Sequence, residues 1–254
     1  MQPDLSPEAV VAVGACGRIV AAVTVGTLPI LPGTSPRIRL ALAASLALVA
    51  VPIATVAPAG ERTVAAIPLV AGELLVGLAM GAAAACTLAA SAWAGGILGS
   101  VSGLAWADDF DPVADGQSAG VTRLAWWVGL AAFFRAGGLL AVVGGLVDGV
   151  RILPVGTVFA GGPAAWLESL VVTAPAAALT LAATLAMPAL VAVIAFHLAS
   201  AICLRAVPFV PGPGLLQGLA SLVLLAGLWL GAEAWAEGGA MLMVRSVEAC
   251  FAGR

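Results

Sequence analysis

The residues best suited to metal chemistry are three aspartates in the most polar interior stretch of the chain, residues 106–120. Asp108, Asp111 and Asp115 follow D-x-x-D-x-x-x-D spacing. Carboxylates at such intervals can hold Mg²⁺ against the phosphates of a substrate, because Mg²⁺ is bound through a few carboxylates and phosphate oxygens. A solvated connecting loop has the same composition, so a metal site needs support elsewhere in the chain.

The rest of the sequence gives that metal site little support. An intramembrane prenyltransferase with this motif also needs a second aspartate cluster and basic residues for the diphosphate. The next acids along the chain are Asp148 and Glu168, which form no cluster, and the chain contains no lysine. We keep an Asp-rich prenyltransferase as a minor alternative only.

A serine activated by a histidine is the second chemistry to weigh. Ser100 and Ser102 lie between glycines in the stretch 99–103, and His197 is the single histidine. Because serine in a glycine-rich helix face usually serves packing, the pattern favours helix packing over an intramembrane serine protease. We expect a protein that is not an enzyme, with no catalytic residue, no cofactor and no metal.

Five charged residues lie inside otherwise apolar stretches. An isolated charge in hydrocarbon costs roughly 2.5–3.5 kcal/mol on insertion scales, so each must pair internally, meet a neighbouring subunit or face water. Structural pairing or partner contact is favoured over a proton relay, because a relay uses acids or histidines in series. The five residues are Arg18, Glu73, Arg135, Asp148 and Arg205.

The composition indicates that these charges belong to a membrane protein. Of 254 residues, 62% are hydrophobic and 9% are charged, and the mean hydropathy is +1.14. A soluble domain carries about 25% charged residues, so this chain has too few to cover its surface. The net charge of −3 argues against nucleic acid as a partner. We expect an all-α integral membrane protein in contact with lipid.

Charge-poor runs mark about six hydrophobic helical segments, because about 20 apolar residues cross a bilayer core. Two runs are over-long: 74–107 has 34 residues and 169–204 has 36, all without formal charge. A 34-residue helix would be about 50 Å long. We expect the first run to bend or form a hairpin at Gly95-Gly96, and the second to be interrupted by Pro175 and Pro188. The other segments are 10–28, 39–56, 121–147 and 214–236.

Glycines recur at helical spacing in several of these segments. Residues four apart lie on one helix face, where a missing side chain lets another backbone approach closely. The pattern predicts tight packing, either inside the chain or against other membrane subunits. The third segment carries Gly77, Gly81, Gly95, Gly99 and Gly103, and later pairs occur at 145 and 149 and at 227 and 231.

The chain also carries a series of short motifs in a fixed order. Each is common by itself, and their order along the chain is the informative property. They are Arg18, Leu28-Pro29-Ile30-Leu31, Pro36-Arg37-Ile38-Arg39-Leu40, Pro52, Glu73-Leu74-Leu75-Val76-Gly77, Phe110-Asp111-Pro112, Leu153-Pro154-Val155-Gly156 and Leu204-Arg205-Ala206-Val207-Pro208.

In this order the motifs resemble the FliR/SctT family of export-gate subunits in bacterial type III secretion machines, along nearly the whole chain. The resemblance implies a subunit that assembles with FliP-like and FliQ-like proteins, and with an FlhB/SctU-like export switch protein, into a pore for unfolded substrates. It implies the bacterial inner membrane, at a flagellar basal body or an injectisome base. The flagellar branch is favoured, because residues 95–156 look closer to it.

The resemblance also implies how the chain is organised. Residues 1–254 would form a single membrane-embedded export-gate domain, and the polar loop 107–120 would be the plug of the closed pore, with Asp109, Phe110, Asp111 and Pro112 at its centre. A small-solute or ion transporter remains the alternative function. It predicts internal repeats with matched broken helices, and the sequence shows no convincing duplication.

Overall fold

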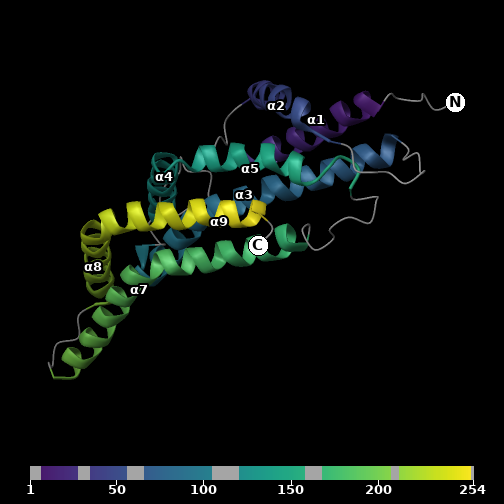
Figure 1. The fold of residues 1–254 in the computed structure, drawn as a ribbon. Coiled ribbons are helices and arrows are strands. Elements are labelled where there is room, and N and C mark those ends of the chain that lie inside the picture. Colours follow the sequence, from purple (N-terminus) through teal and green to yellow (C-terminus); the bar gives the residue numbers. More distant parts are fainter. Residues whose placement is uncertain are drawn as a thin grey trace. The chain divides into compact units, whose positions relative to one another are not determined.

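The fold is all-α in the part of the chain that the computed structural model describes, residues 7–27, 35–55, 66–104, 120–157, 168–206 and 212–252. Every regular element in these ranges is helical, and none is a strand (Figure 1). The predicted all-α membrane fold is therefore confirmed. The elements are α1 (Pro7–Gly26), α2 (Pro36–Ala50), the 3-10 turn η1 (Val51–Ile53), α3 (Ala66–Ser102), α4 (Gly120–Arg135), α5 (Gly138–Ile152), the π-turn η3 (Ser169–Thr173), α7 (Ala174–Ala206), α8 (Pro213–Ala234), the π-turn η4 (Trp235–Gly239) and α9 (Ala240–Ala252).

Five helices in the described ranges are long and apolar enough to cross a bilayer: α1, α2 with η1, α3, α7 and α8. A sixth span results if α4 and α5 are taken together as one broken segment. The helices contribute to two compact units. Unit 1 comprises Met1–Thr87, Gly137–Ala177 and Val244–Arg254, and unit 2 comprises Leu88–Ala136 and Ala178–Met243.

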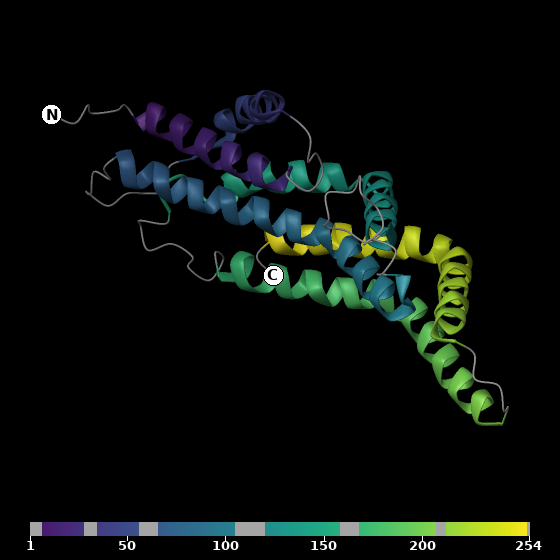
Figure 2. The same cartoon turned by 180° about the vertical axis from the view of Figure 1, so that it is seen from behind.

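In unit 1, α1 packs against α2, α5 and the first part of α3. In the opposite views of Figures 1 and 2, α1 runs beside α3. The contact with α3 depends on two of the spaced glycines. A Cβ atom on Gly77 would overlap the backbone carbonyl of Arg18, and one on Gly81 would overlap that of Ala22. These glycines therefore serve a close helix contact inside the chain.

In unit 2, the second part of α3 packs against α4 through Gly95. A Cβ atom there would lie 2.6 Å from Cβ of Ala125 and 2.8 Å from Cα of Thr122. The hairpin alternative at Gly95-Gly96 is wrong, because α3 continues as a helix through both glycines. The physical reason is that an unbroken helix satisfies every backbone hydrogen bond in an apolar setting, and the glycines allow close packing instead of a turn.

The segment predicted at 121–147 is two helices, α4 and α5, separated at Gly137. Gly137 has a φ of 84°, a left-handed conformation that glycine adopts without steric cost. In the over-long run 169–204, η3 precedes Pro175, which is the second residue of α7. Pro188 lies inside α7 without ending it, so the predicted interruption there is wrong. A membrane helix can tolerate the one hydrogen bond that proline removes.

Helix α9 was not among the predicted segments. It has 13 residues, fewer than a bilayer span needs. Its buried positions include Ala240, Met243, Val244 and Val247, whereas Arg245 and Glu248 are exposed. In unit 1 its end reaches α5, since a Cβ atom on Gly145 would overlap the ring of Phe251. A short amphipathic helix gives a weaker hydropathy signal than a span.

Candidate functional site

The strongest candidate site is a buried ion pair in unit 1, between Arg18 of α1 and Glu73 of α3. Their side chains are 2% and 1% exposed. Nε of Arg18 donates to Oε2 of Glu73 at 2.7 Å, and Nη2 lies 2.5 Å from the same oxygen. Two opposite charges at this separation compensate each other, which is the condition for keeping charge in a protein interior.

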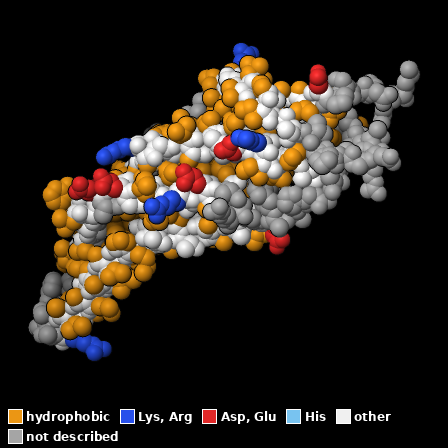
Figure 3. Space-filling view, viewed as in Figure 1, with side chains coloured by type: hydrophobic (Ala, Val, Ile, Leu, Met, Phe, Trp, Pro, Cys, Tyr) orange, Lys and Arg blue, Asp and Glu red, His pale blue; other side chains and the backbone are white. Residues whose placement is uncertain are grey.

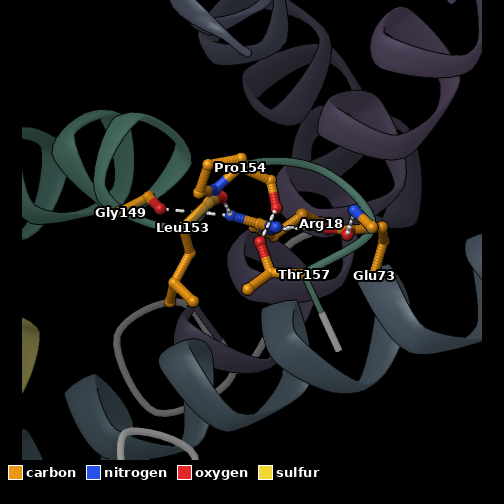
Figure 4. Close-up of polar contacts among 7 residues, drawn as sticks. Arg18, Glu73, Gly149, Leu153, Pro154 and Thr157 are labelled. Carbon is orange, nitrogen blue, oxygen red and sulfur yellow. Dashed lines mark hydrogen bonds and ion pairs between the residues drawn. The ribbon is translucent and has the colours of Figure 1, made fainter. Parts of the chain in front are cut away.

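The other terminal nitrogen of Arg18 binds the end of α5. Its Nη1 donates to the backbone carbonyls of Gly149, at 3.1 Å, and Leu153, at 2.7 Å (Figure 4). The last carbonyls of a helix lack partners within the helix, and the helix dipole favours a cation at this end. Arg18 therefore supplies a donor to the carbonyl of Leu153 and a second donor to that of Gly149, which also accepts the N–H of Leu153, and it is attracted to the C-terminus of α5.

The second oxygen of Glu73 binds the chain that follows α5. Oε1 accepts the backbone N–H of Gly156 at 2.8 Å. The preceding residue, Val155, donates its N–H to the carbonyl of Thr55, after η1, at 2.8 Å. The hydroxyl of Thr157 donates to the carbonyl of Pro154. The segment 153–157 is thus bound on one side by the ion pair and on the other by the end of η1.

These contacts form one network, which we call the Arg18–Glu73 clamp: Arg18, Glu73, and the backbone of Gly149, Leu153 and Gly156. Four of the five guanidinium N–H groups have acceptors, and both carboxylate oxygens accept hydrogen bonds. Because its hydrogen-bonding capacity is nearly used within the chain, the clamp has little left for a substrate or a proton. Its chemistry is the positioning of α1, α3 and α5.

The remaining charged candidates behave differently. In unit 2, Arg135 lies 3.8 Å from Glu237 of η4, with both side chains largely exposed. Asp148 and Arg205 are exposed, and neither forms an ion pair with another residue in the described ranges. The structure therefore brings together Arg18 and Glu73 but does not gather the other three. The sequence analysis missed Glu237, which lies just beyond an apolar run and so resembles an ordinary terminal charge.

The predicted plug lies outside the described residues, and so does the aspartate motif. These residues are Asp108, Asp109, Phe110, Asp111, Pro112 and Asp115. The structure does describe the helix ends on both sides of that loop, in unit 2. After α3, Gly103 has a φ of 75° and approaches the side chain of Gln217 on α8. Before the loop returns to α4, Gly120 and Thr122 begin the helix that packs on Gly95.

The serine and histidine candidates show no catalytic arrangement in the part of the chain described. The hydroxyls of Ser100 and Ser102 donate to carbonyls of their own helix, those of Ile97 and Gly99. The ring of His197 packs edge-on against Phe196, with centroids 5.8 Å apart. Within the same ranges, no three His, Cys, Asp or Glu side chains gather as metal ligands.

The chain matches the family described as bacterial export proteins, family 1, over residues 11–244. It belongs to that family. The match confirms the resemblance to FliR and SctT, and it spans all the residues of the clamp. A search of curated proteins finds no match. This member of the bacterial export proteins is thus a membrane component of a bacterial export apparatus.

Proposed function

We propose that this protein is a FliR-like subunit of the flagellar or type III protein export gate. It assembles with FliP-like and FliQ-like subunits, and with an FlhB/SctU-like switch protein, into the pore for unfolded substrates. It acts as a single membrane-embedded domain in the bacterial inner membrane, at a flagellar basal body in preference to an injectisome base. The observation that carries the proposal is the family match over 11–244 of a chain built from bilayer-length helices.

The distribution of burial supports an assembled subunit. The charges of Arg18 and Glu73 are compensated inside the chain, whereas α8 and the end of α7 present apolar side chains outward (Figure 3). On α8, Trp229 and Leu230 are 80% and 77% exposed. The same helix has glycines whose added Cβ atom would meet nothing within 4 Å, a surface that another helix can approach closely. These are Gly214, Gly218, Gly227 and Gly231.

We further propose that residues 107–120 are the plug, with Asp109, Phe110, Asp111 and Pro112 at its centre. The support comes from the two ends of the loop. Gly103 lies against Gln217, and Thr122 lies against Gly95, so each end is packed on a helix of unit 2. A polar segment between two anchored ends can rearrange without unpacking the helices that hold those ends.

The first test is the composition of the native particle. The tagged chain is extracted from its own membrane in mild detergent, and the proteins that co-purify are identified by mass spectrometry. We expect a large stable particle that contains FliP-like and FliQ-like subunits. A lone monomer or homodimer would contradict the export-gate role and favour the small-solute or ion transporter.

The plug is tested separately by ion leakage through the assembled particle in the native membrane. Phe110→Ala removes a large side chain from the centre of the loop, and we expect increased ion leakage in the resting state. Phe134→Ala, on the exposed face of α4, is the matched control. Equal leakage from both variants argues against the plug without affecting the subunit assignment.

A further inference from the structure

Two helical segments of unit 2 are sparsely packed, and we call them the arm: residues 189–206 of α7 and 213–234 of α8. After Val193, no residue of α7 with a described side chain is buried. On α8 the buried residues with described side chains are Ala220 and Leu224. Figures 1 and 2 both show the end of α7 extending beyond the other helices of unit 2. An element with so few buried contacts is free to move if its two attachments bend.

The first attachment of the arm is at Pro188, inside α7. Proline has no N–H, so the helical hydrogen bond to the carbonyl of Thr184 is missing, and the ring crowds that carbonyl. One turn earlier, the hydroxyl of Thr184 donates to the carbonyl of Thr180 at 2.8 Å. A threonine bonded in this way often bends a helix. The α7 helix is therefore weakened where the arm begins.

The second attachment is the π-turn η4, Trp235–Gly239, directly after α8. A π-turn holds one more residue than an α-helical turn and has i→i+5 hydrogen bonds, and such turns occur frequently at functional sites. It interrupts an otherwise continuous helix from Pro213 to Ala252. The arm is thus joined to the rest of unit 2 through an irregular position at each of its ends.

The two irregular positions meet at Leu185, three residues before Pro188. The indole Nε1 of Trp235 donates to the carbonyl of Leu185 at 3.1 Å. At the other end of η4, a Cβ atom on Gly239 would lie 2.7 Å from Cδ2 of Leu185, so this position has no room for a side chain. Leu185 is therefore contacted by both ends of η4, once through its carbonyl and once through its side chain.

We propose that Pro188 and η4 form a paired hinge on which the two arm segments, 189–206 and 213–234, move together. An arm held by two helices can rotate only if both helices bend at the same level, and the Leu185 contacts place these two bends together. Away from the hinge, a long hydrogen bond of 3.4 Å from the hydroxyl of Ser221 to the carbonyl of Ser102 holds the arm to the end of α3. Arm movement breaks this contact and the packing of Gln217 on Gly103, and it exposes few other side chains, because Ala220 and Leu224 are the buried residues of α8 with described side chains.

The hinge is tested by amide hydrogen exchange of the purified full-length protein in lipid nanodiscs, with no export reaction involved. Pro188→Ala restores the missing helical hydrogen bond in α7. We expect about fivefold slower exchange in residues 189–193 and also in 235–239, which the substitution does not touch, because one net hydrogen bond changes an opening equilibrium by about that factor. The matched control is Pro52→Ala, in η1 of unit 1, which should leave both segments unchanged.

The reverse substitution is Trp235→Phe, which removes the indole N–H and keeps an aromatic ring. We expect about fivefold faster exchange in 235–239 and in 189–193, for the same physical reason. Trp229→Phe, on the exposed face of α8, is its control. The proposal is overturned if each variant changes only its own attachment, or if neither segment responds. Because the readout is exchange in the purified chain, this result is independent of the export-gate assignment.

Discussion

The Arg18–Glu73 clamp gives the sharpest prediction, because one substitution removes a charge while keeping the shape of the site. Glu73→Gln retains a side-chain oxygen for the N–H of Gly156, but it leaves the buried guanidinium of Arg18 without a counter-charge. Breaking a buried pair in this way costs about 3–5 kcal/mol. For a chain of this size, that loss lowers Tm by roughly 6–20 °C.

The double variant Arg18→Met with Glu73→Gln removes both charges. The carbonyl of Gly149 keeps the N–H of Leu153 as a donor, at 3.1 Å. The new amide N–H₂ at position 73 is unpaired in both variants, so the carbonyl of Leu153 is the main additional group that loses its partner in the double variant. One such buried group costs about 1–3 kcal/mol. The double variant should therefore be about 2 kcal/mol more stable than Glu73→Gln alone, which corresponds to a Tm roughly 4–8 °C higher.

Thermal unfolding in detergent, followed by the loss of helical circular dichroism, measures these differences. Glu248→Gln, at an exposed position of α9 in the same unit, controls for the loss of a carboxylate and should leave Tm unchanged. A double variant with a Tm at or below that of Glu73→Gln would refute the reasoning, because the two charges would then not be compensating each other.

Two further predictions concern packing and surface charge. Gly77→Ala should destabilise the protein by about 1–3 kcal/mol, because the added methyl group overlaps the backbone of Arg18. The control, Gly218→Ala, adds its methyl group in open space on α8. It should leave stability unchanged or raise it by up to about 1 kcal/mol through helix propensity. Equal Tm values for the two variants would contradict the close helix contact. Arg135→Ala should change stability by no more than about 0.5 kcal/mol, since its pairing with Glu237 is exposed; a larger loss in the same Tm assay would show that the pair is worth more than its exposure implies.

Much of the fold follows from local composition. A run of about 20 apolar residues needs a helix in lipid, because a helix satisfies its own backbone hydrogen bonds. The sequence therefore predicts α1, α2, α3, α7 and α8 from their apolar runs, and the order of the short motifs indicates the family. It also shows that Arg18 and Glu73 are charges in apolar surroundings that require compensation.

Tertiary structure alone decides which partners compensate those charges. Arg18 and Glu73 are 55 residues apart, and the carbonyls and amide that complete the clamp come from residues 149–156. Nothing local to Arg18 distinguishes Glu73 from the other acids of the chain, because the pairing depends on how α1, α3 and α5 pack. The same holds for the glycines. Gly77 and Gly227 lie in similar apolar helices, yet Gly77 contacts the backbone of Arg18 and Gly227 faces open space. Composition determines what a segment needs, and only packing between distant segments determines what satisfies it.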